Sequence, residues 1–480
     1  MSIRKMPIAV IGAGAGGLVI ANGAAKAGKK VLLIENGRYG GDCTNFGCIP
    51  SKSLIASAHA AYALKEAYEL GLKISESPLD ASRCLERVRE IIKEIRSEED
   101  PAALQKNGVE TLTGFASFQD PHTLIVKSPD GKTTQIEASH IVIATGSTPF
   151  IPDVEGLKKT PFLTNETIFD LKAIPKRLII LGGGPIGSEL AQAFLRLGSQ
   201  VSLVHKHEEL LNKEEKLAQT VLANQCAKEG MQLFLGFQVE SVHYEQDEFT
   251  VVLTKNGSTQ KKIIRADALL VATGRRPTLQ GLGLENAEVN YDEKGIHVDA
   301  YGRTNQKHIF AVGDVTGGPL FTHAAENQAR SILVSLLLPS FLKKRLDRKQ
   351  SVPRVTYTDP EIASVGLSEE AAKKIYKPSS LAIYVVPFTV VDRAITAGRT
   401  EGFVKVVTKK WSSRILGATI VAPRAGEMLM QLSTAMHAGI PLRKLANLIH
   451  PFPTYSLSIR KAADLWLTQT IIPFFKGRPN

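Results

Sequence analysis

The hydrophobic residues of this chain fall into short runs, and one of these runs opens a larger pattern. Residues 8–11 form an apolar run of strand length, a glycine-rich turn follows at 12–17, and the stretch to about residue 29 has helical character. A second apolar run at 31–34 ends at Glu35. A strand, a glycine turn, a helix and a second strand predict a βαβ unit within a parallel sheet.

The same pattern recurs in the middle of the chain. An apolar run at 178–181 leads into a glycine-rich turn at 182–187, a helix to about residue 198 and a strand at 201–204. Two such units predict an α/β protein with two Rossmann-like dinucleotide-binding domains. Two further apolar runs end in turns at Gly146 and Gly274, which predict chain crossings between the domains. We also expect Gly146 and Gly274 to be cofactor-binding residues.

The glycines of both units suit the binding of a dinucleotide. They allow a tight turn and a close approach of a pyrophosphate to the following helix N-terminus. Glu35 stands where a carboxylate accepts a hydrogen bond from a ribose hydroxyl. The predicted cofactor-binding glycines are Gly12, Gly14 and Gly17 in the first unit and Gly182, Gly184 and Gly187 in the second.

The second unit has no acid at the position that matches Glu35. His205, Lys206 and His207 stand there instead, and cations suit a ribose 2′-phosphate. We therefore expect NADPH at Lys206 and His207, with NADH as the other possible nucleotide. The alternative is that these side chains face solvent, with Glu208 and Glu209 weakening the positive field.

Composition places the chain among large globular proteins. Its 480 residues suggest about three domains, and 43% hydrophobic with 22% charged residues is ordinary for a globular chain. No apolar run reaches the ~20 residues of a membrane span. The N-terminus lacks a secretory pattern, so we expect a cytoplasmic protein. The net charge of +12 is dispersed except at 343–345 and 348–349, which argues against nucleic-acid binding.

Two cysteines lie just beyond the first unit. Cys43 and Cys48 are separated by four residues that include Asn45 and Gly47. A regular helix would hold them about 7.5 Å apart, so a disulfide needs a distorted turn. A helix starting there, with Lys52 one turn later, would lower the thiol pKa values. These features predict a redox-active pair.

A structural disulfide and half of a zinc site are the alternatives for this pair. No second cysteine pair completes a metal site, and the expected compartment does not favour structural disulfides. The isolated Cys84 and Cys226 are expected to be packing residues. We expect no resident metal ion.

A later strand at 309–312 ends in Gly313 and Asp314, and Thr322 begins an apparent helix. These residues offer a carboxylate and helix-end amides to a second face of a dinucleotide. With these motifs, in this order, the chain resembles over its length the flavoprotein disulfide reductases: dihydrolipoamide dehydrogenase, glutathione reductase and mercuric reductase. Residues 351–366 resemble the start of their C-terminal α+β dimerisation domain.

The resemblance implies FAD, NAD(P)H and a homodimer. It implies that Cys48 faces the flavin as the charge-transfer thiolate and that Cys43 exchanges with substrate. Lys52 would pair with Glu189 beside the flavin, and Thr322 would offer its backbone amide. It also implies three domains: FAD binding at 1–147 and 276–348, NAD(P) binding at 148–275, and an interface domain at 349–480.

The C-terminal segment departs from this family. Disulfide-reducing relatives carry a His-Pro-Thr element and a glutamate four residues after the histidine, as acid/base for thiol exchange. Aligning Pro453-Thr454 with that element puts Phe452 at the histidine and Leu457 at the glutamate, and neither moves a proton. His450 and Tyr455 are the nearby candidates, with a structural role favoured for His450.

Mercuric reductases carry a tyrosine where this chain has Phe452, and residues 189–198 look closest to theirs. The chain shows no C-terminal cysteine pair and no N-terminal metal-binding module, so this resemblance is partial. Three hypotheses follow. The first is an FAD-dependent NAD(P)H oxidoreductase whose acceptor is a metal ion, quinone or small disulfide. The second is a dihydrolipoamide dehydrogenase with a displaced base. The third is a flavin-bound redox sensor without turnover.

Overall fold

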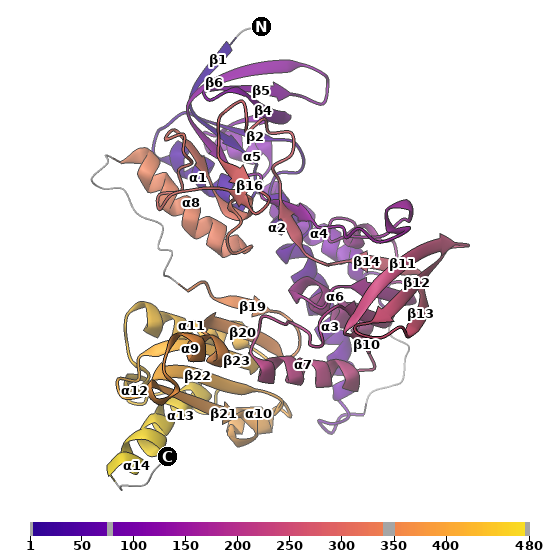
Figure 1. The fold of residues 1–480 in the computed structure, drawn as a ribbon, viewed down its shortest axis with the longest axis vertical. Coiled ribbons are helices and arrows are strands. Elements are labelled where there is room, and N and C mark those ends of the chain that lie inside the picture. Colours follow the sequence, from indigo (N-terminus) through magenta and orange to yellow (C-terminus); the bar gives the residue numbers. More distant parts are fainter. Residues whose placement is uncertain (1–2, 74–79, 339–350, 476–480) are drawn as a thin grey trace.

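Three groups of strands, each covered by helices, make up the computed structural model (Figure 1). It describes residues 3–73, 80–338 and 351–475. The basic clusters at 343–345 and 348–349 lie outside these residues, as do the last five residues of the chain. Within the described residues, no helix is long and apolar enough to cross a membrane.

The first sheet contains the first predicted βαβ unit. Its strands run in the order β3-β2-β1-β6-β5-β4, and β18 also pairs with β6. The pairs β1–β2, β1–β6, β2–β3 and β6–β18 are parallel, whereas β4, β5 and β6 form an antiparallel meander. The strands are β1 (Ile3–Ile11), β2 (Val31–Glu35), β3 (Glu110–Thr113), β4 (Phe115–Asp120), β5 (Thr123–Lys127), β6 (Thr133–Ile143) and β18 (Ile309–Ala311).

Two helices pack together against this sheet. Helix α1 (Ala15–Lys26) follows the first glycine turn, and α8 (Thr322–Leu337) comes from much later in the chain. Gly23 permits their contact, because a Cβ there would lie 2.2 Å from a Leu333 methyl carbon. The predicted helix start at Thr322 is confirmed, while the first helix ends at Lys26 rather than near residue 29.

The second sheet is fully parallel and contains the second βαβ unit. Its order is β10-β9-β8-β14, formed by Gln232–Leu235, Gln200–His205, Arg177–Leu181 and Ala268–Val271. Helices α6 (Pro185–Arg196) and α7 (Lys216–Lys228) accompany it. An antiparallel sheet of β11 (Phe237–Glu245), β12 (Glu248–Lys255) and β13 (Lys261–Ala266) lies beside it (Figure 1).

The two predicted crossings lie side by side. Strand β7 (Ser147–Pro149) pairs antiparallel with β15 (Arg275–Pro277), so the chain leaves and re-enters the first body through one two-stranded link. Helices α2 (Gly41–Asn45), α3 (Cys48–Glu66), α4 (Cys84–Ser97) and α5 (Pro101–Lys106) follow β2, and the short pair β16 (Tyr291–Asp292) and β17 (Gly295–Ile296) follows β15.

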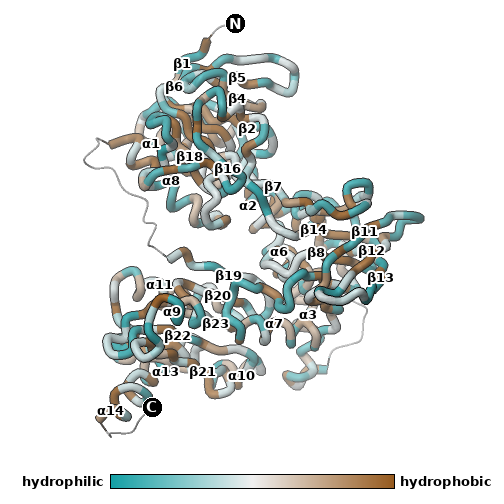
Figure 2. The backbone as a smooth tube through the Cα atoms, viewed as in Figure 1, coloured by the Kyte–Doolittle hydropathy of each residue, from teal (hydrophilic) through white to brown (hydrophobic). Residues whose placement is uncertain are grey.

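The third body has the predicted α+β character. Its sheet has the order β19-β20-β23-β22-β21 and is antiparallel throughout. Figure 2 shows apolar positions concentrated along its central strands. The elements are β19 (Arg354–Thr356), β20 (Glu361–Gly366), α9 (Glu369–Ile375), β21 (Leu381–Pro387), α10 (Asp392–Thr396), β22 (Phe403–Lys409), β23 (Ile415–Ala422), α11 (Ala425–His437), α12 (Leu442–Leu445), α13 (Leu457–Trp466), a π-helical turn at Leu467–Ile471 and α14 (Ile472–Phe475).

A buried ion network joins helices α3 and α6 to the third body. The Arg196 guanidinium on α6 lies 2.7 Å from Glu229 and 2.9 Å from Asp359, and its side chain is 1% exposed. Arg399 also contacts Asp359 at 2.6 Å and reaches Glu66 on α3 at 2.6 Å. Each buried charge therefore has an opposite partner, which offsets its desolvation.

Removing the central cation tests this network. Arg196→Met should lower the free energy of unfolding by about 3–5 kcal/mol, because Glu229 and part of Asp359 become uncompensated buried charges. The loss of stability is measured from the shift in the midpoint of urea unfolding, monitored by circular dichroism. Arg177→Met is the control, since the partners of Arg177 are exposed, and a midpoint shift as large as that of Arg196→Met would contradict the account.

Candidate active site

One large cleft joins both glycine fingerprints and the cysteine pair. Its volume is about 2300 Å³, and it runs from the turn after β1, past Cys43 and Cys48, to the turn after β8. The predicted site residues that line it are Gly12, Gly14, Glu35, Cys43, Cys48, Lys52, Gly146, Gly182, Gly184, Glu189, Lys206, His207, Gly274, Gly313, Asp314 and Thr322. Gly17 and Gly187 are not among its lining residues.

The backbone between the cysteines breaks the helix as predicted. Helix α2 ends at Asn45, Phe46 and Gly47 leave the helical conformation, and α3 begins at Cys48. The Asn45 amide holds this turn by donating to the carbonyls of Tyr39 and Gly41, at 2.9 Å each. Cys48 therefore lies at the positive end of a 19-residue helix.

The pKa values of the two thiols are shifted in opposite directions. A hydrogen bond with Cys43, followed by the Lys52 charge, outweighs burial and lowers the pKa of Cys48 to about 6. The same bond and burial raise the pKa of Cys43. The Thr322 hydroxyl lies 3.7 Å from the Cys48 sulfur. Cys48 is consequently the thiolate at neutral pH, and Cys43 is the thiol.

Lys52 is held by an ion pair between α3 and α6. Its Nζ donates to Glu189 Oε2 at 2.7 Å, and the Glu189 side chain is 6% exposed. Burial disfavours the ammonium, but the carboxylate outweighs it and raises the pKa of Lys52. The other Glu189 oxygen accepts from the Tyr357 backbone amide at 2.8 Å, and Lys52 Nζ lies 4.5 Å from the Tyr357 ring centre. Sequence reasoning missed Tyr357.

The first fingerprint fits a dinucleotide. Gly12 has φ +104°, and a Cβ on Gly17 would lie 1.9 Å from the Gly12 carbonyl, so these glycines let α1 approach β1. Gly14 caps α1 without any side-chain bond, which leaves the helix-end amides open to an anion. Glu35 accepts from the Ala13 and Gly37 amides, at 2.6 Å each.

The second fingerprint repeats this geometry. Gly182 has φ +117°, and a Cβ on Gly187 would lie 1.8 Å from the Gly182 carbonyl. Gly184 caps α6, again without a side-chain bond and with nothing within 4 Å of a built Cβ. Two equivalent cradles open into one cleft, so the residues present suit two dinucleotides.

His205 takes the place of Glu35 in the hydrogen bonding of the second unit. Its Nδ1 accepts from the Gly183 amide at 3.0 Å, as Glu35 accepts from Ala13 in the first unit. Burial, with help from His207 and Lys206, lowers the pKa of His205 to about 4. The ring is therefore neutral, and its buried Nε2 has no hydrogen-bond partner among the described residues. Lys206 and His207 are exposed and line the cleft.

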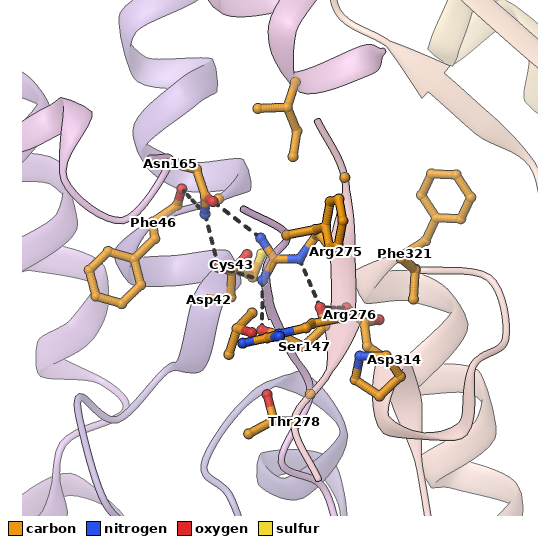
Figure 3. A pocket seen from close by; sticks show the side chains of 18 of the residues that line it. Asp42, Cys43, Phe46, Ser147, Asn165, Arg275, Arg276, Thr278, Asp314 and Phe321 are labelled. Carbon is orange, nitrogen blue, oxygen red and sulfur yellow. Dashed lines mark hydrogen bonds and ion pairs between the residues drawn. The ribbon is translucent and has the colours of Figure 1, made fainter. Parts of the chain in front are cut away.

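Arg275 forms a hub that sequence reasoning missed. Its guanidinium lies 3.0 Å from Asp42 Oδ1, and it also donates to the hydroxyl and the carbonyl of Ser147, both at 2.8 Å (Figure 3). The Ser147 hydroxyl in turn donates to Asp314 at 2.6 Å. Asn165 donates to Asp42 at 3.1 Å. Arg275 and Asp42 lay within motifs singled out in the sequence, but only the fold brings them together.

Neither C-terminal candidate for a proton carrier lines the cleft of its own chain. His450 donates from Nδ1 to the Leu448 carbonyl at 3.0 Å, and its Nε2 accepts from Gln431 at 2.9 Å. The Tyr455 ring stacks 5.8 Å from that of Phe388. Phe452 is 71% exposed, whereas Leu457 is buried.

The remaining cysteines pack as predicted. Cys226 is fully buried, and burial raises its pKa to about 12. Cys84 begins α4 and contacts the same core. No cluster of metal-ligating side chains occurs within the described residues.

Two nucleotide cradles that share a cleft with an activated dithiol define a two-dinucleotide oxidoreductase. Residues 6–329 match the family model of the pyridine nucleotide-disulphide oxidoreductases, and residues 352–463 match the dimerisation domain of these enzymes. The chain belongs to the pyridine nucleotide-disulphide oxidoreductase family, whose members use FAD and NAD(P)H. The predicted family, fold class and enzyme class are thereby confirmed.

Relatives with different names resemble the chain to a similar degree. It is 34% identical over 462 residues to a mercuric reductase from Streptomyces lividans, covering 95% of each chain. It is 36% identical over 478 residues to a dihydrolipoyl dehydrogenase from Thermus scotoductus, covering 98% and 99%. A Cu(II) complex of the HOCl-induced flavoprotein disulfide reductase RclA from Escherichia coli superposes with a TM-score of 0.85 at 28% identity, covering 96% and 99%.

Replacing Lys52 tests the origin of the Cys48 acidity. In the reduced protein, Cys48 alkylation plotted against pH should inflect near 6, because only the thiolate reacts. Lys52→Met should move this inflection upward by about 1–3 pH units, so less thiolate is present at pH 7. Lys65→Met, on the exposed side of α3, is the control. An inflection that stays in place in Lys52→Met would contradict the account.

Proposed function

We propose that this enzyme passes electrons from NADPH through FAD to the Cys43/Cys48 pair and on to a soft, thiol-binding metal ion. The observation that supports this acceptor most is an activated dithiol without a proton carrier at its expected place. Phe452 and Leu457 occupy the aligned positions, both ring nitrogens of the nearby His450 are hydrogen-bonded, and Tyr455 does not line the cleft of its own chain.

The two acceptor classes differ in their need for an acid. Reduction of a disulfide must protonate the departing thiolate, a step for which general acid catalysis is typically worth about 10²–10⁴-fold. A soft metal ion instead binds the thiolate directly and displaces the proton of the second thiol. A dithiol with one low-pKa sulfur therefore serves a metal ion without Phe452 or Leu457 taking part.

The electrons balance within the pair. Oxidation of the Cys48 thiolate and the Cys43 thiol to the Cys43–Cys48 disulfide releases two electrons and one proton. The two electrons reduce two Cu(II) to Cu(I) or one Hg(II) to Hg(0). When bound, FAD supplies the two-electron link between the nicotinamide and this pair. The names of two relatives, a mercuric reductase and a reductase studied with Cu(II), agree with this acceptor class.

We assign four residues to the reaction. Cys43 meets the acceptor, and Cys48 is the thiolate on the flavin side. Lys52 keeps a positive charge beside that thiolate, and Glu189 fixes the position of Lys52. The proposed FAD-binding residues are Gly12, Gly14, Gly17, Glu35, Gly146, Gly313, Asp314 and Thr322, and the proposed NADPH-binding residues are Gly182, Gly184, Gly187, Lys206, His207 and Gly274.

We further infer three domains and a homodimer. The separate sheets support an FAD domain at 1–147 and 276–348, an NADPH domain at 148–275 and an interface domain at 349–480. The dimerisation-domain match and exposed apolar side chains such as Ile449 and Phe452 support self-association through the third domain. Residues 449–457 would then face the partner's cleft.

Cysteine variants test the acceptor. Under anaerobic conditions, kcat/KM for Cu(II) or Hg(II) should exceed that for lipoamide or glutathione disulfide by about 100-fold, the lower range of missing acid catalysis. Cys43→Ser and Cys48→Ser should each abolish metal-dependent NADPH oxidation, whereas Cys84→Ser should retain it. Faster turnover of either disulfide would reject the metal-ion proposal and favour a dihydrolipoamide dehydrogenase or related activity.

A charge change at His205 tests the nucleotide preference. A carboxylate there repels a 2′-phosphate, so His205→Glu should lower kcat/KM for NADPH by roughly 100-fold and raise it for NADH. His205→Gln should stay close to wild type, because its amide can accept from Gly183 and donate toward the cleft. Dissociation constants for 2′,5′-ADP and 5′-ADP give a second readout. A wild-type preference for NADH would contradict the proposal.

A further inference from the structure

An acidic residue follows the glycine that packs against the phosphate end of the first cradle. Gly41, which begins α2, packs so closely on Gly14 that a Cβ on Gly41 would lie 2.5 Å from the Gly14 Cα. Gly14 caps α1, where the pyrophosphate of a dinucleotide is expected. Asp42 follows Gly41 and lines the same cleft. A free carboxylate at this place would repel the phosphates.

Asp42 also influences other acids in the cleft. Burial raises the pKa of Glu166, and the Asp42 charge adds to this effect. Burial likewise raises the pKa of Asp314, and Asp42 again adds to it while Arg275 opposes it. Three carboxyl groups therefore share the field of the Arg275 guanidinium, whose side chain is 10% exposed. The Asp42 side chain is 39% exposed, so water screens this ion pair from one side only.

The hub directs Arg275 at Asp42. Asn165 donates to the same Asp42 oxygen that Arg275 contacts, and the Ser147 hydroxyl and carbonyl orient the guanidinium from the other side (Figure 3). The positive charge of Arg275 therefore compensates the negative charge of the Asp42 carboxylate. The ion pair with Asp42 also weakens the attraction between Arg275 and any phosphate in the cleft.

We propose that the Asp42–Arg275 ion pair sets the affinity for FAD, with Arg275 cancelling a carboxylate that otherwise repels the pyrophosphate. The inference rests on the family's use of FAD and not on the identity of the acceptor. It predicts opposite effects at the two positions. Loss of Asp42 frees the guanidinium for the phosphates, whereas loss of Arg275 leaves an uncompensated carboxylate.

Flavin fluorescence, titrated with FAD-free protein, measures the dissociation constant directly. Asp42→Asn should tighten FAD binding by about 3–10-fold, and Arg275→Met should weaken it by more than about tenfold. The double variant should return to within about threefold of wild type, because both charges are gone. Glu137→Gln, which breaks an exposed pair with Lys5 on the same sheet, is the control and should change nothing.

The sign of the Asp42→Asn effect decides the question. If the pair only braces the loop that carries Cys43, both single variants weaken FAD binding and the double variant does not recover. That result would overturn the proposal. Should Arg275→Met fail to fold, Asp42→Asn alone remains decisive: tighter binding with a steeper salt dependence supports the proposal, and weaker binding rejects it. Neither outcome depends on which acceptor the enzyme uses.

Discussion

The ion pair between Lys52 and Glu189 is the interaction on which the redox centre depends. It joins α3, which begins with Cys48, to α6, which begins with the second glycine fingerprint. The Tyr357 amide, from the segment before β20, completes the bonding of Glu189. This partly buried contact therefore fixes the thiolate relative to the second nucleotide cradle and the third body. The positive charge of Lys52 also stabilises the Cys48 thiolate, so the same ion pair controls both the position and the reactivity of Cys48.

The two nucleotide cradles differ at one position in a common framework. Glu35 and His205 end equivalent strands, and each accepts from the backbone amide of the second fingerprint residue. We propose that the Glu35 carboxylate accepts from a ribose diol, whereas the His205 ring offers no carboxylate at the equivalent place. Replacing a carboxylate by an imidazole at this position keeps the hydrogen bond to the backbone amide and changes only the charge presented to a ribose. The enzyme can thus hold two dinucleotides of different chemistry in one cleft.

Local patterns predicted most of this framework. Both βαβ units, the broken turn between the cysteines and the start of α8 at Thr322 follow from glycine positions and short apolar runs, which act over a few residues. The Arg275 hub and the buried Arg196 network were beyond such reasoning, because their partners lie 33 to 333 residues apart in the chain. The low pKa of His205 follows mainly from burial, which composition does not reveal. Phe452 and Leu457 were visible in the sequence, and their apolar character still distinguishes this site.

The most direct test of the account is a single-turnover count of thiols. Protein reduced anaerobically with one equivalent of NADPH would be mixed with Cu(II) and quenched at intervals with an alkylating reagent. The account predicts that label on Cys43 and Cys48 disappears together, at least as fast as steady-state turnover, while Cys84 and Cys226 are unaffected. Reduction of the metal ion with both thiols still available for labelling would contradict it, because the electrons would then bypass the pair.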